Sequence, residues 1–99
     1  MVAITPGIEA EVPKHILGHL YSLAMDFGKK LGEPTWLILD PAAKRKGLED
    51  EGRTLRMPFA FHRKIWMIKE DWSHVPKEVR EAHGVYGDVV VSIMFPEEY

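Results

Sequence analysis

The residues with the clearest capacity for chemistry are the cations in the middle of the chain. Seven of the 13 Lys and Arg side chains fall between positions 44 and 64, namely Lys44, Arg45, Lys46, Arg53, Arg56, Arg63 and Lys64. Guanidinium groups bind phosphate oxygens in pairs, and aromatic rings stack on nucleobases. Four of these cations would contact phosphate, and one nearby aromatic ring would stack. The sequence therefore predicts a site for a phosphate-bearing ligand, a nucleotide or nucleic acid, formed by Arg53, Arg56, Phe61, Arg63, Lys64 and Trp66.

The charge of the flanking segments restricts what this site can hold. Residues 44–64 carry seven basic side chains against three acidic ones, whereas both flanking segments are acidic and the whole chain carries −2. Acidic ends would repel a long polyanion, so a compact phosphate ligand fits better than a duplex. Strand alternation also places Arg56 and His62 on one side of the expected strand and Phe61 on the other. A solvated charged loop is the alternative interpretation.

Other candidate groups lack the neighbours that catalysis or metal binding requires. His15 and His19 have the spacing of a Zn²⁺ site, but the glutamate of H-E-x-x-H is missing and no cysteine can complete the site. Two solvated histidines are the simpler interpretation. None of the three serines, Ser22, Ser73 and Ser92, lies in a nucleophile motif. We therefore expect a binding protein that is not an enzyme and has no metal or cofactor.

The acidic end of the chain supports a second hypothesis. Glu97, Glu98 and Tyr99 could dock into a basic pocket of a host protein, which would make the chain a protein–protein inhibitor or adaptor. A strand end frayed into solvent is the simpler interpretation of these residues. A small uncharacterised enzyme is the third hypothesis, and no motif favours it.

Hydrophobic periodicity predicts two helices. Between Pro13 and Leu31 apolar side chains recur on one helical face, Pro13 suits a first turn, and Gly32 ends the segment. A shorter helix is expected from about Pro76, with Gly84 as its stop. The long helix should pack its apolar face on a sheet.

Five segments have the apolar runs or the alternation of strands, namely residues 2–5, 36–39, 55–61, 65–68 and 89–95. The charged segment 42–53 has no period and predicts a mobile loop. We expect one α+β domain over residues 1–99. Its sheet would be mostly antiparallel with four to five strands, one long helix on one face and a short second helix before the last strand.

Length and composition restrict the class of protein. With 99 residues, 45% of them hydrophobic, the chain is expected to form one core. Its apolar runs are too short to cross a membrane and its start does not resemble a signal peptide, so we expect a cytoplasmic protein without membrane contact. Cys, Asn and Gln are absent, which favours a thermophilic source. Exposed strand edges in a small chain favour a homo-oligomer, most simply a dimer.

Several short segments have a familiar pattern. They are ITPGI at residues 4–8, EVP at 11–13, KIWMI at 64–68 and SIMFPEEY at 92–99. In these pieces the chain resembles a small Firmicutes family, domain of unknown function 960. The middle departs from that family, and residues 76–83 look like an insertion. The resemblance implies a bacterial, phage or mobile-element protein without catalytic residues to carry over, and for such an origin the binding hypothesis becomes sequestration of a nucleotide signal.

Overall fold

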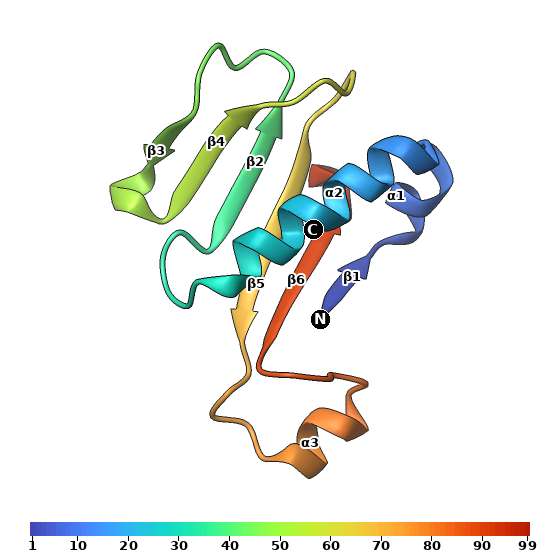
Figure 1. Ribbon diagram of the computed structural model, residues 1–99, viewed down its shortest axis with the longest axis vertical. Helices are drawn as coiled ribbons and strands as arrows, with labels where there is room; N and C mark the ends of the chain where they lie inside the picture. Colours follow the sequence, from blue (N-terminus) through green and yellow to red (C-terminus); the bar gives the residue numbers. More distant parts are fainter.

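The computed structural model describes all 99 residues and places six strands in one sheet, in the order β1-β6-β5-β2-β4-β3 (Figure 1). The strands are β1 (Val2–Ile4), β2 (Trp36–Asp40), β3 (Gly47–Glu49), β4 (Thr54–Pro58), β5 (Ile65–Asp71) and β6 (Val89–Met94). The helices are α1 (Pro6–Glu11), α2 (Lys14–Lys29) and α3 (Lys77–Ala82), with 3₁₀ turns η1 (Asp50–Gly52) and η2 (Pro96–Glu98). The α+β class is confirmed, as are the long helix and a short helix before the last strand.

The sheet is mixed, so the expectation of four to five mostly antiparallel strands is wrong. β1 runs parallel to β6 and β2 runs parallel to β4, whereas the other neighbouring pairs are antiparallel. The unpredicted strand is β3, which lies inside the expected loop at 42–53. All three of its residues are exposed, so no apolar alternation marks it. Its hairpin with β4 turns the chain back and places β4 parallel to β2.

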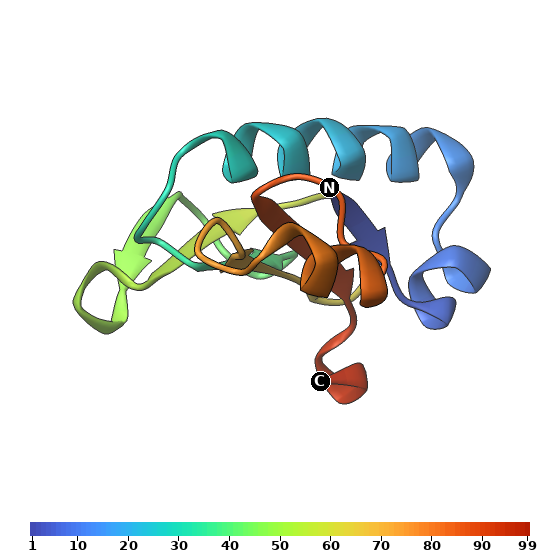
Figure 2. The same ribbon diagram turned by 90° about the horizontal axis from the view of Figure 1, so that it is seen from below.

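Helix α2 covers one face of the sheet (Figure 2). Leu20 and Ala24 of this helix are fully buried and belong to one core with Leu39 and Ile93 of the sheet. The predicted amphipathic helix is therefore confirmed, although it ends at Lys29, two residues before the expected end. Packing of this apolar face on the sheet provides most of the stability of the helix, because isolated helices of this length are only marginally stable in water.

Helix α1 is absent from the sequence prediction, in which Pro6-Gly7 indicates a turn. Pro6 instead occupies the first turn of the helix, where the missing N–H has no intrahelical partner to lose. The hydroxyl of Thr5 caps the helix by accepting the N–H of Ile8 at 3.4 Å. Ile8 is the one buried residue of the six, so no periodic signal marks the helix.

The short helix α3 lies beyond the ends of β5 and β6 (Figure 1). The sequence predicts that Val75, Val79 and Ala82 form an apolar side of this helix, but none of them is buried. Polar contacts hold the segment instead. The guanidinium of Arg80 donates to the carbonyl of Gly87 at 2.8 Å and to the carboxylate of Asp88 at 2.7 Å.

Side chains alternate between the two faces of each strand, and α2 meets only one of these faces. In β5, Ile65 and Met67 are buried, whereas Trp66 and Ile68 are half-buried on the opposite side. We call that opposite side the open face. Its central side chains, matched across the strands by register, are Trp36, Ile38, Arg56, Trp66, Ile68, Ser92 and Met94. Figure 2 shows α2 on one side of the sheet and η2 with the end of the chain on the other.

Candidate functional site on the open face

Three aromatic side chains gather on the open face. Trp36 of β2 and Trp66 of β5 have ring centroids 5.0 Å apart, with their planes at 66°. Tyr99 follows η2, and its ring lies 5.2 Å from that of Trp36 and 6.1 Å from that of Trp66. Both indoles are half-buried and Tyr99 is 76% exposed, so all three rings remain accessible. Such a cluster can receive another planar ring by stacking.

Four of the six residues predicted to bind a ligand lie on this face or at its border, namely Arg53, Arg56, Lys64 and Trp66. Arg53 comes directly before β4, and its carbonyl accepts the N–H of Trp36 at 3.2 Å. Arg53 and Trp36 also line a shallow hollow of about 420 Å³. Lys64 precedes β5 and shares the parity of Trp66, which places the two on the same side. The fold therefore places two cations and two indoles on one surface, with the cations at opposite ends of β2. Arg53 lies at the Trp36 end, because Trp36 pairs with Thr54, and Lys64 lies at the Asp40 end, because Leu39 pairs with Ile65.

Arg56 is neutralised by two carboxylates. Its guanidinium donates to Asp40 at 2.6 Å and to Glu49 at 2.7 Å. The Ala42 N–H, followed by Arg56 and Lys64, holds the pKa of Asp40 below its usual range despite its burial. Arg56 likewise lowers the pKa of Glu49. A guanidinium that is already paired twice has little left for a phosphate. Arg53 has one exposed partner, Glu51 at 3.3 Å, and Lys64 has none, so these two are the better phosphate contacts.

Phe61 and Arg63 do not join the other predicted residues. β4 ends at Pro58, and the chain then turns Phe61 into the core, where it is 7% exposed and stacks on Phe95 at 6.2 Å. The guanidinium of Arg63 lies 3.8 Å from the centre of the Phe95 ring and binds the carboxylates of Glu11 and Glu97. Arg63 thus ties α1 to η2.

The acidic end of the chain folds back onto α1. The carboxylate of Glu98 accepts the hydroxyl of Thr5 at 2.6 Å and the N–H groups of Gly7 and Phe95, each at 3.0 Å. These bonds, led by that of Thr5, lower the pKa of Glu98. A Cβ at Gly7 would lie 2.6 Å from this carboxylate, which explains the glycine. The carboxylates expected to dock on a host protein are therefore occupied within the chain.

Two residues of the aromatic cluster are missing from the sequence-predicted site, Trp36 and Tyr99. Trp36 begins a continuous apolar run. Without alternating polar residues, the run does not show which of its side chains face away from the core. Tyr99 reaches the indoles only because η2 reverses the chain after β6. The pairing of β2 with β5 is the missing signal, since it brings Trp36 and Trp66 together across 30 residues of sequence.

The two histidines of α2 lie one helical turn apart on its solvent-exposed side. His15 and His19 are both exposed on α2, and the ring of His19 lies 5.3 Å from that of Phe59. No three His, Asp or Glu side chains converge in a way that would hold a metal ion. None of the helices has both the length and the apolar character needed to cross a membrane.

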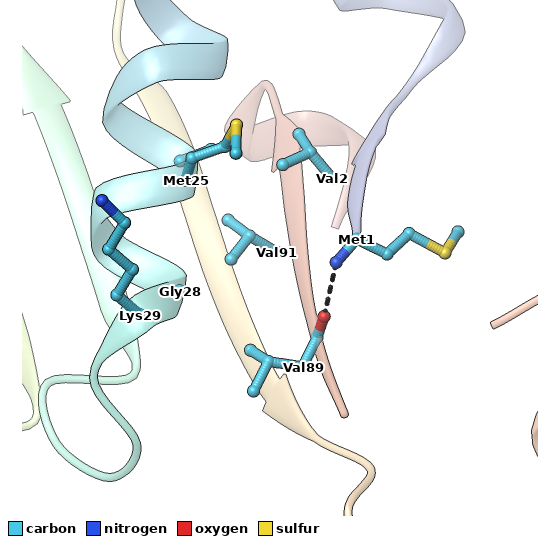
Figure 3. Close-up of a pocket in the computed structure, with 8 residues that line it drawn as sticks. Met1, Val2, Met25, Gly28, Lys29, Val89 and Val91 are labelled. Atoms are coloured by element: carbon cyan, nitrogen blue, oxygen red, sulfur yellow. Dashed lines mark hydrogen bonds between the residues drawn. The ribbon is translucent and has the colours of Figure 1, made fainter. Parts of the chain in front are cut away.

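A small apolar hollow of about 180 Å³ lies between α2 and the β1–β6 edge (Figure 3). Beside it, the backbone nitrogen of Met1 donates to the carbonyl of Val89 at 2.8 Å. Gly28 lets the helix come close, because a Cβ there would lie 3.1 Å from a methyl group of Val91. Six of its eight lining residues are apolar, and its volume is below the roughly 300–1,000 Å³ of small-molecule sites. We therefore interpret it as a packing gap between the helix and the sheet.

Comparison with protein-family models, with curated proteins and with solved structures finds no match to this chain. The resemblance of its end segments to domain of unknown function 960 stays a prediction, as do the thermophilic source and the dimer.

Proposed function

We propose that the protein binds a nucleotide-like ligand reversibly on its open face and leaves it chemically unchanged. The base stacks in the cluster of Trp36, Trp66 and Tyr99, and the phosphate is contacted by Arg53 at the Trp36 end of β2 or by Lys64 at the Asp40 end. The observation that carries this proposal is the cluster of Trp36, Trp66 and Tyr99 on the sheet face that α2 leaves uncovered, with one of the two cations, Arg53 or Lys64, at each end of β2. Reversible binding without turnover amounts to sequestration of the ligand.

The charges of the open face favour a compact ligand. Asp40 and Glu49 neutralise Arg56, and Glu70 of β5 lies on the same side as Trp66 by strand alternation. These carboxylates would repel successive phosphates of a long strand. A base stacked on an aromatic side chain contributes about 1–3 kcal/mol, so stacking can provide much of the affinity for one or two nucleotides.

Thermal-shift measurements test the proposal with mononucleotides and with short single-stranded oligonucleotides as separate arms. Binding to the native state must raise the melting temperature. The variant Arg53→Glu/Lys64→Glu should lose this rise while its unliganded melting temperature stays close to that of the parent, because exposed cations add little to stability. Lys14→Glu/Lys77→Glu is the matched control, since it makes the same charge change on α2 and α3 and should bind normally.

Three results would contradict the proposal. One is the absence of a shift with any nucleotide or oligonucleotide. Another is equal binding by the Arg53→Glu/Lys64→Glu variant and the parent. The third is recovery of a chemically altered ligand, which would show an enzyme instead of a binding protein.

A further inference from the structure

A buried lysine lies on the face of the sheet that α2 covers. Lys69 of β5 is 7% exposed, and its ammonium donates to the carbonyls of Lys30 at 2.6 Å and Phe27 at 3.2 Å. These carbonyls belong to the end of α2, where the helix dipole favours a cation. No carboxylate pairs with Lys69. Its ammonium also lies 4.5 Å from the centre of the Phe27 ring, and its third N–H has no hydrogen-bond acceptor in the protein.

Lys69 lines a hollow of about 430 Å³ between the end of α2 and strands β2 and β4. This volume falls in the range of small-molecule sites, which is roughly 300–1,000 Å³. Five of its ten lining residues are hydrophobic and form an apolar side that includes Phe27, Leu37 and Met57. Lys46, from the segment before β3, is a second cation at the cavity.

The charge of the cavity is positive. Lys30, Lys46 and Lys69 line it, and the one acidic lining residue, Asp26, is paired with Lys29 at 3.4 Å. Burial, with a smaller contribution from Lys30, lowers the pKa of Lys69. An anion at this point would restore the balance of charge that the protein itself does not supply.

We propose that this cavity is a second binding site, separate from the open face, for an amphipathic anion with a carboxylate head and a short apolar chain. The carboxylate binds Lys69 and Lys46, and the chain lies against Phe27, Leu37 and Met57. Lysine ammonium groups act as compact point charges that can bind a carboxylate, and the apolar side of the cavity matches a short apolar chain. The site is on the opposite face from Trp36 and Trp66, so the two proposals stand or fall separately.

Calorimetric titration with octanoate tests the proposal, with octanol as the neutral probe of the same chain length. Octanoate should bind and octanol should bind at least about tenfold more weakly. Lys46→Glu, at the rim, should weaken octanoate binding by about tenfold or more, whereas Lys44→Glu, two residues away and outside the cavity lining, should not. Octyl phosphate is the arm that distinguishes a phosphate head from a carboxylate.

Lys69→Met provides the second variant, and its circular dichroism spectrum shows whether the fold is kept. A folded Lys69→Met protein should lose octanoate binding, and if that variant unfolds, Lys46→Glu against Lys44→Glu decides the question. The proposal is overturned by equal binding of octanol and octanoate, by equal effects of the Lys46 and Lys44 substitutions, by preference for octyl phosphate, or by no octanoate binding at millimolar concentration. Displacement of octanoate by a nucleotide would show that the sites are not separate.

Discussion

Leu20→Ala is expected to lower the free energy of unfolding by about 2–5 kcal/mol. Leu20 has no solvent exposure and lies at the centre of the α2 side that packs on the sheet. Its truncation removes apolar contacts and leaves a cavity that the sheet cannot fill by moving. Domains of this size are stabilised by only about 5–15 kcal/mol, so the loss is a large share of the total.

Urea unfolding measures this effect, and Met25→Ala is the matched control. Met25 is on the same helix but is 62% exposed, so its truncation should change the stability by no more than about 0.5 kcal/mol. If Leu20→Ala changed the free energy of unfolding by as little as Met25→Ala, the packing of α2 on the sheet through Leu20 would be contradicted.

Trp66→Leu is expected to weaken nucleotide binding by about tenfold to a hundredfold, the equivalent of about 1–3 kcal/mol for one stacked base. Leucine keeps an apolar side chain on the sheet but offers no flat ring. Trp72→Leu is the control, because Trp72 is also half-buried but lies near α3, with its ring 5.9 Å from that of His83. Calorimetric titration of both variants with the best nucleotide from the thermal-shift series gives the comparison, and equal affinities would contradict stacking on Trp66.

The elements that sequence predicts correctly have a period of apolar residues, a continuous apolar run such as that of β2, or clear start and stop residues such as Pro76 and Gly84 around α3. α2 has Leu20, Leu23, Ala24 and Phe27 at helical spacing, and the structure buries or half-buries all four. β3 and α1 are too short for such a pattern, and one is wholly exposed. The parallel pairings depend on long-range contacts that no local pattern contains.

The candidate site was predictable only in its chemistry. A stretch rich in cations and aromatic residues predicts a phosphate-bearing ligand, but the register of the strands cannot be read from the stretch itself. Phe61 lies three residues beyond β4 and turns inward, whereas Trp66 lies within β5 and faces outward. The carboxylates that occupy Arg56 and Arg63 come from other elements, so their effect appears only when the chain is folded.

The most direct test of nucleotide binding on the open face uses the indole N–H signals of the three tryptophans in a ¹H–¹⁵N NMR titration. Trp36 and Trp66 are in the proposed site, and Trp72 is outside it and serves as an internal reference. Addition of a nucleotide is expected to shift the signals of Trp36 and Trp66 in a saturable way and to leave that of Trp72 unchanged. Uniform shifts of all three signals, or saturable shifts confined to backbone amides of α2 and α3, would contradict binding on the open face.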